Sequence, residues 1–275
     1  MRVLFLYAEV MGYTVATIRS LVATGVELHV VYWDKNKLTP YVFPLFDGVF
    51  YYPRSEFSIQ TLKDLADRID PTITVVSGWT DRGYLPVARA LRRKGRVVVA
   101  GLDAQWHASA RQRIAGLLGV CGLFSAFFSH AWVAGSRQFE FARRMGFPAS
   151  HILLDLYSAD TEIFQSAYTE VRKSEDRVYP KVFLFVGRLE KVKGLETLIA
   201  AWEILRPRRG DWRLRLIGDG SMKDSLRNVP DVDVSGFLQP ESLVSVAIFP
   251  CVSAFLQCHD QDSQSTILYI RRLQA

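Results

Sequence analysis

The feature that most constrains the fold of this chain is a series of short apolar runs with little polar alternation. They cover residues 3–7, 27–32, 72–76, 97–100, 131–134, 182–186 and 214–217. Such runs are typical of parallel strands that are buried on both faces. Helix-like segments lie between them, at residues 14–24, 59–69, 83–94, 137–145 and 195–205. The alternation predicts an α/β chain with helices on both sides of a parallel sheet.

The length of 275 residues allows two ordinary domains. A polar, charged stretch without strand pattern lies between about residues 165 and 180, and a new apolar strand follows it. We therefore predict an N-terminal Rossmann-like domain at residues 1–165, a linker at 166–180 and a second Rossmann-like domain at 181–275.

Charge and cysteine usage narrow the class of partner. The net charge is +6 and the pI is about 9.3, which favours anionic partners such as nucleotide phosphates, acidic lipid headgroups or nucleic acid. The three cysteines show neither paired nor zinc-ligand spacing, so we expect no disulfide framework and no zinc site. We also expect no other metal and no cofactor. This usage fits a reducing cytoplasm. Nucleic acid is the weakest of these partners, because no recognised binding module is present.

Two apolar segments raise the question of a membrane. The first, at the N-terminus, is too short for a secretory signal and is predicted to be a strand. The second, residues 114–134, has no Asp, Glu, Lys or Arg. It is long enough for a transmembrane helix, but its glycines and His130 favour a helix followed by a buried strand.

The loop after residues 182–186 carries the clearest chemical signal. Gly187 permits close approach of a ligand to the backbone, while Arg188 and Lys193 bring two cations before a helix. Ligands of α/β proteins bind beyond the carboxyl ends of strands, and helix N-termini attract phosphate. The segment therefore predicts a nucleotide diphosphate site.

A second glycine-rich turn, Gly218, Asp219 and Gly220, follows residues 214–217 at the same edge of the same predicted sheet. Taken alone, either loop is compatible with a tight turn or a solvated basic loop. Together and in order, they favour nucleotide binding.

Ordered motifs connect these loops to a known family. They read Phe185-Val186-Gly187-Arg188 with Lys193-Gly194, Ile217-Gly218-Asp219-Gly220, and Val234-Ser235-Gly236-Phe237. The set resembles the donor-binding domain of GT-B glycosyltransferases, in particular the retaining family 4 (glycosyl transferases group 1). More loosely, Trp132 to Ser136 resembles the last strand of the first domain, and residues 155–164 resemble the connector between the domains.

The resemblance implies a retaining hexosyltransferase that moves a sugar from a nucleotide diphosphate sugar to a glycan or lipid-linked acceptor, as in polysaccharide biosynthesis. Arg188 and Lys193 would neutralise the departing diphosphate electrostatically, without a metal. Gly187, Gly218, Asp219 and Gly220 would surround the nucleotide.

On the acceptor side, two loops follow predicted strands of the first domain. Glu9 and Gly12 lie in one, and Asp103, Trp106 and His107 lie in the other. Asp103 and His107 are candidates to orient an acceptor hydroxyl, and Trp106 to stack on a sugar ring. The alternatives are that Asp103 caps a helix and that Trp106 belongs to the core.

Basic residues at positions 89, 92–94, 96, 111 and 113 surround the charge-free stretch. In family members that glycosylate lipid-linked acceptors, such a surface rests on an anionic membrane. The resemblance therefore permits a peripheral location on the inner membrane face, and a solvated helix face is the alternative.

The family pattern fails after about residue 246. Family members carry a pair of glutamates that contact the donor, but this chain has no Glu beyond Glu241. We therefore expect a second domain that is truncated or divergent, with impaired activity. The main alternative function is a non-catalytic nucleotide or nucleotide-sugar binding remnant, or one part of an assembly. A nicotinamide-dependent oxidoreductase is disfavoured, because residues 9–13 contain only one glycine, Gly12.

Overall fold

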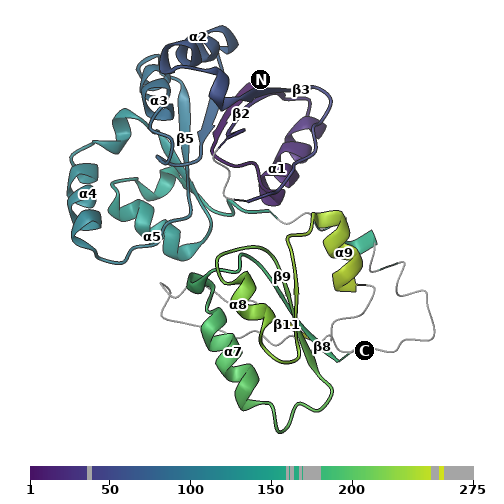
Figure 1. Ribbon diagram of the computed structural model, residues 1–275. Coiled ribbons are helices and arrows are strands. Elements are labelled where there is room, and N and C mark those ends of the chain that lie inside the picture. The colour runs from purple at the N-terminus through teal and green to yellow at the C-terminus, as the bar shows by residue number, and fades with distance from the viewer. Residues whose placement is uncertain are drawn as a thin grey trace. The chain divides into compact units, whose positions relative to one another are not determined.

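The computed structural model describes residues 1–35, 39–158, 161, 164–166, 169, 181–248 and 254–256, the last three and residues 245–248 by backbone alone. The chain divides into two compact units, Met1–Asp160 and Thr161–Ala275, called unit 1 and unit 2 below (Figure 1). The predicted linker at 166–180 falls almost wholly outside the described residues, so its bounds stay a prediction.

Unit 1 is a parallel sheet with helices around it. Its strands run β3-β2-β1-β4-β5-β6-β7 across the sheet. They are β1 (Arg2–Tyr7), β2 (Glu27–Tyr32), β3 (Val49–Pro53), β4 (Ile73–Val76), β5 (Val97–Leu102), β6 (His130–Val133) and β7 (Ile152–Leu153). The helices are α1 (Gly12–Ala23), α2 (Ile59–Ile69), α3 (Tyr84–Arg93), α4 (Ala110–Val120) and α5 (Ser136–Arg144). Three short 3₁₀ turns complete it, η1 (Arg54–Glu56), η2 (Phe124–Ala126) and η3 (Ala149–His151).

The strand order reverses between β1 and β4, because the chain builds outward to β3 on one side and to β7 on the other. The central strands are buried, as at Leu4, Leu6 and Val76, which are at most 1% exposed. Side chains of α2 and α3 complete the core beneath them. A crevice beyond the carboxyl ends of β1 and β4 is therefore the position where such sheets bind ligands.

Helix α4 packs through its glycines. A Cβ at Gly119 would lie 2.2 Å from the carbonyl oxygen of Met145, and one at Gly116 would lie 3.0 Å from that of Arg144. The helix backbone therefore sits directly against the end of α5, and the larger apolar side chains of α4 face outward. Since α4 and β6 account for most of residues 114–134, the predicted helix followed by a strand is confirmed for this segment.

Unit 2 contains a second parallel sheet, in the order β10-β9-β8-β11. Its elements are β8 (Val182–Val186), η4 (Lys191–Lys193), α7 (Leu195–Ile204), β9 (Arg213–Ile217), α8 (Lys223–Arg227), β10 (Val232–Ser235), α9 (Pro240–Ile248) and β11 (Ala254–Leu256). The predicted α/β class with Rossmann-like parallel sheets is therefore confirmed.

Strand β11 lies inside the region that we expected to diverge, yet it pairs in parallel with β8 and so supplies the fourth strand. The rest of that region, residues 249–253 and 257–275, lies outside the described residues. The predicted incompleteness of the second domain therefore stays a prediction.

Candidate functional site

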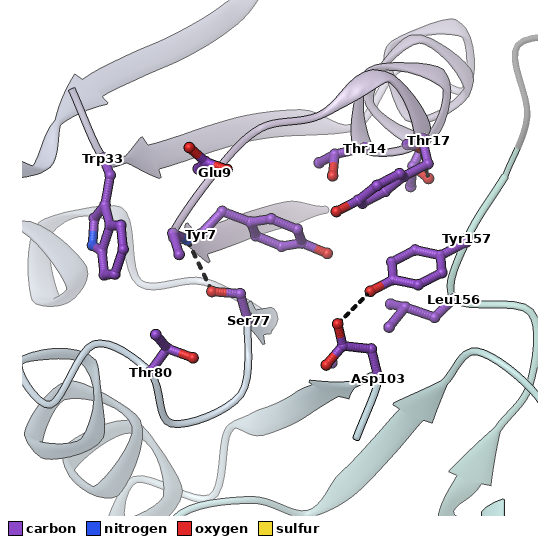
Figure 2. A pocket seen from close by; sticks show the side chains of 13 residues that line it. Tyr7, Glu9, Thr14, Thr17, Trp33, Ser77, Thr80, Asp103, Leu156 and Tyr157 are labelled. Atoms are coloured by element: carbon purple, nitrogen blue, oxygen red, sulfur yellow. Dashed lines mark hydrogen bonds between the residues drawn. The ribbon is translucent and has the colours of Figure 1, made fainter. Parts of the chain in front are cut away.

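The carboxyl ends of four strands of unit 1 surround a pocket of about 230 Å³ (Figure 2). We call it the unit 1 pocket. It is lined by Tyr7, Ala8, Glu9, Tyr13, Thr14, Thr17, Trp33, Ser77, Thr80, Gly101, Asp103, Leu156 and Tyr157. These residues lie at or just after the carboxyl ends of β1, β2, β4 and β5, in α1, or in the segment after β7. The pocket therefore occupies the crevice at the reversal of strand order.

Asp103 and two tyrosines form one wall of this pocket. The hydroxyl of Tyr157 donates a hydrogen bond of 2.9 Å to Oδ2 of Asp103 (Figure 2). The centroid of the Tyr13 ring lies 4.3 Å from that of the Tyr157 ring. Burial, and then the charge of Asp103, raise the pKa values of both tyrosines, so their hydroxyls stay protonated at neutral pH. The donor of Tyr157 is thus used by the Asp103 carboxylate, and the wall combines two aromatic rings with that carboxylate.

Glu9 and Ser77 hold the opposite side in place. Oε1 of Glu9 accepts a hydrogen bond of 3.1 Å from the backbone N–H of Thr39, and the Ser77 hydroxyl accepts one of 2.9 Å from the N–H of Ala8. The hydroxyl of Thr14, on α1, is buried and has no hydrogen-bond partner among the described residues. Hydroxyls and carboxylates thus surround a small cavity, which suits a ligand rich in hydroxyl groups.

The structure separates the residues that we predicted for the acceptor side. Glu9 and Asp103 line the unit 1 pocket together, and Gly12 begins α1 beside it. His107 is exposed and does not line this pocket. Trp106 packs on the apolar core, with the Arg144 guanidinium 5.0 Å above its ring, as in the core alternative stated above. Asp103 does not cap α4, because the Ser109 side chain does so.

In unit 2, the two glycine-rich loops lie in direct contact. The N–H of Leu189 donates to the carbonyl of Asp219 at 2.8 Å, and the N–H of Gly187 donates to that of Ile217 at 3.0 Å. Gly218 has a φ of 151°, and a Cβ there would lie 1.8 Å from the carbonyl oxygen of Gly187. Gly220 has a φ of 156°, and a Cβ there would lie 2.5 Å from the carbonyl oxygen of Leu189. Both glycines are thus required by conformation and by space.

The charged residues of these loops differ in their contacts and in their exposure. Glu190 accepts hydrogen bonds from the hydroxyl and N–H of Ser221, at 2.6 and 3.0 Å, and these bonds lower its pKa. Lys223 lies 3.0 Å from Oδ2 of Asp219 and, as the largest cause, lowers the pKa of that carboxyl. Arg188 is exposed beside Gly187, and Lys193 is half-buried at the start of α7. The Glu190 carboxylate thus braces one loop against the other.

Sequence reasoning missed several of these residues. Tyr13, Trp33, Ser77 and Tyr157 line the unit 1 pocket, and Glu190 joins the loops of unit 2. Trp33 and Ser77 come directly after predicted strands. Their position at strand ends could have identified them as candidate ligand-binding residues. Nothing in the local sequence marks Tyr157, because its contact with Asp103 depends on the return of the chain after β7.

A second pocket and an adjoining groove lie elsewhere on unit 1. The pocket, which we call the apolar pocket, has a volume of about 820 Å³ and is lined mainly by apolar side chains of Trp79, Leu85, Ala115, Leu123, Phe124, Phe127, Phe128, Phe141 and Met145. Arg82 and Phe127 also line the adjoining basic groove, together with Lys63, Arg89 and Arg93. No acidic side chain is among the described residues that line either one.

No helix among the described residues has the length and apolar character needed to cross a bilayer. No group of three or more His, Cys, Asp or Glu among them is placed to hold a metal ion.

Two parallel α/β sheets, with paired glycine loops in the second, resemble the fold of the GT-B glycosyltransferases. Known proteins share sequence with one segment of this chain and share its fold. Residues 168–230 match the family model described as "Glycosyl transferases group 1". The matched segment contains both glycine-rich loops, so the predicted resemblance is confirmed there.

One curated protein and two solved structures show the same likeness to glycosyltransferases. An uncharacterized glycosyltransferase of Haemophilus influenzae is 35% identical over 49 residues, which is 18% of this chain and 14% of that protein. HepE of Anabaena, crystallised with UDP, superposes with a TM-score of 0.60 at 14% identity, over 95% of this chain and 76% of its own. The lipopolysaccharide outer core galactosyltransferase WaaB superposes with a TM-score of 0.54 at 18% identity, over 94% and 74%. At these identities, the structural matches establish the fold.

Proposed function

We propose that this protein is a retaining glycosyltransferase that moves a hexose from a nucleotide diphosphate sugar to a glycan or lipid-linked acceptor. The observation that carries the proposal is the pair of interlocked glycine loops, Gly187 to Glu190 and Gly218 to Ser221, with Arg188 and Lys193 beside them. The match of this segment to group 1 glycosyltransferases supports the same assignment.

In this proposal, the nucleotide lies against the backbone of the two loops. Gly218 and Gly220 keep the loops together, because the carbonyls of Gly187 and Leu189 fill the space that a Cβ would need. Arg188 and Lys193 stabilise the negative charge that grows on the diphosphate as its bond to the sugar breaks. The stabilisation comes from the protein's own cations, so the proposed mechanism has no resident cofactor or metal.

The unit 1 pocket receives the acceptor in this proposal. Asp103 and Glu9 accept hydrogen bonds from its hydroxyls, and the Tyr13 and Tyr157 rings cover its apolar faces. Asp103 thereby orients the hydroxyl that becomes bonded to the anomeric carbon of the donor sugar. His107 lies outside the pocket lining, so we give it no role in this proposal.

Calorimetric titration with UDP, GDP and ADP tests the donor site. We expect saturable binding of UDP, since HepE, which shares the fold, was crystallised with it. The nucleotide that binds then determines which sugar nucleotides are used as donors in transfer assays. A folded chain that binds none of the three nucleotides would contradict the proposal.

A non-catalytic nucleotide-sugar binding protein is the second candidate. It is favoured by the absence of any Glu beyond Glu241, where the family resemblance places a donor-binding pair. Measurement of sugar release from the donor, with and without acceptor, separates the two functions. Binding without hydrolysis or transfer would support the second candidate.

We also propose that the protein is peripheral and that unit 1 contacts the cytoplasmic face of an anionic membrane. Helix α4 and the turn after it expose an apolar patch, with Ile114, Leu117, Leu118, Val120 and Leu123 between 45% and 74% exposed. Arg111 and Arg113 lie on the same helix. Arg111 also lines the apolar pocket, which adjoins the basic groove. Apolar side chains with flanking cations favour insertion at a charged bilayer surface.

Substitution of Leu117 and Val120 by Gln should weaken binding to vesicles that contain anionic lipid. Each apolar side chain contributes about 1 kcal/mol or more when it leaves water, so a loss of about tenfold or more is expected. Vesicle sedimentation measures it. Val42→Gln plus Leu45→Gln is the matched control, because these side chains are equally exposed, at 68% and 69%, but lie outside α4. An equal loss in the control would contradict the assignment to α4.

A further inference from the structure

The lining of the unit 1 pocket has an uneven distribution of charge. Two of the residues that line it, Glu9 and Asp103, carry carboxylates, and no Lys, Arg or His is among its described lining residues. The remaining polar groups are hydroxyls, of Tyr13, Thr17 and others. Carboxylates are thus the only formally charged side chains among the described residues that line this pocket.

The rest of unit 1 shows that this distribution is local. The apolar pocket and the basic groove are lined by five cations, Lys63, Arg82, Arg89, Arg93 and Arg111, and by no described carboxylate. The net charge of the chain is +6, so the formal charge of the residues that line this pocket has the opposite sign to that of the whole chain. Anionic ligands are therefore favoured at the basic groove and disfavoured at the unit 1 pocket.

The hydrogen-bonding capacity of the pocket agrees with its charge. Carboxylates accept hydrogen bonds and cannot donate them, so they bind hydroxyl or ammonium groups and repel carboxylate or phosphate. Tyr157 already donates its proton to Asp103, and Ser77 already accepts one from Ala8. Glu9 likewise accepts a hydrogen bond from Thr39. A carboxylate oxygen can accept more than one hydrogen bond, so Glu9 and Asp103 suit a ring with several hydroxyl donors.

From these observations we infer that the unit 1 pocket selects for an uncharged, hydroxyl-rich sugar ring and discriminates against anionic sugars, through Glu9 and Asp103. The inference rests on the proposed function, in which this pocket binds the acceptor. The volume of about 230 Å³ suits a ligand on the scale of one ring. Acceptors that end in a uronic acid or a phosphorylated sugar are disfavoured by the same two carboxylates.

Direct binding measurements on the full chain test this inference without donor or transfer. The probes are methyl glucoside with methyl glucuronoside, and methyl galactoside with methyl galacturonoside, titrated by ligand-observed NMR. We expect each neutral glycoside to bind about tenfold more tightly than its uronoside, because a unit charge within several ångströms of two others is repelled even at high effective dielectric. Methyl glucosaminide, which carries an ammonium group, should bind no more weakly than methyl glucoside.

Two variants identify the source of the selectivity. Glu9→Gln plus Asp103→Asn should reduce the ratio within each pair to about threefold or less, because it removes both charges and keeps similar side-chain shapes. Asp64→Asn is the matched control, since this exposed carboxylate lies on α2 outside the pocket and its removal should leave the ratio unchanged.

The outcomes separate this inference from the proposed function. Equal binding of neutral and anionic glycosides, or no binding of any glycoside, overturns the inference even where UDP binds to the same sample. A ratio that the double variant leaves unchanged also overturns it, because the carboxylates would then not cause it. Failure of UDP to bind, with neutral glycosides still preferred, counts against the proposed function and leaves the charge selectivity in place.

Discussion

Substitution of Gly218 by alanine should destabilise unit 2 by about 3 kcal/mol or more and abolish nucleotide binding, because backbone strain and steric overlap add at this position. The new Cβ would lie 1.8 Å from the carbonyl oxygen of Gly187, which is backbone and cannot rotate away. The φ of 151° is also rarely adopted by a residue with a side chain. Relief requires the two loops to separate, which breaks the hydrogen bond from Leu189 to Asp219.

Hydrogen exchange measures this effect within unit 2 alone. Amides of β8 and β9 should exchange faster in the variant, whereas those of unit 1 should not change. Gly210→Ala is the matched control, because Gly210 also has a positive φ, of 57°, but has no atom within 4 Å of a Cβ position. It should cost only about 1 kcal/mol, the usual strain of a left-handed residue. Equal losses in the two variants would show that crowding between the loops contributes nothing.

Replacement of both Arg188 and Lys193 by alanine should weaken binding of a nucleoside diphosphate by about a hundredfold or more. A hydrogen bond to a charged group contributes about 1.5–3 kcal/mol, and each tenfold in affinity corresponds to about 1.4 kcal/mol. Arg188 is exposed and Lys193 is half-buried, so we expect the fold to tolerate both changes. Calorimetric titration with the nucleotide that binds the unaltered chain measures the loss.

A charge-matched control is available at the opposite edge of the same unit. Arg206 and Arg208 are exposed and follow α7, whose N-terminus lies at the loops and whose C-terminus lies away from them. Replacement of both by alanine removes the same net charge and should change affinity by less than about threefold, since distant exposed charges are screened by salt. If this control loses affinity as Arg188→Ala plus Lys193→Ala does, long-range charge explains the binding, and the assigned contacts are wrong.

Much of the fold could be predicted from the sequence, because buried parallel strands leave apolar runs that are visible locally. Strands β1, β2, β8 and β9 were predicted nearly at their observed bounds. Strands β3, β7 and β10 were not predicted. β3 is a half-buried edge strand that ends at Pro53, β7 has two residues, and β10 alternates polar with apolar residues. Their strand character depends on the neighbour that pairs with them.

The sequence by itself determined the alternation of strands and helices, the two glycine-rich loops and the cations beside them. These features are local, because a strand end, a glycine and a following helix lie within a few residues of one another. Only the tertiary structure decided that Trp106 packs on the core, that α4 turns its large apolar side chains outward, and that Tyr157 returns to Asp103. Each depends on which distant segment packs against the residue, and hydrophobic pattern alone carries no information about that choice.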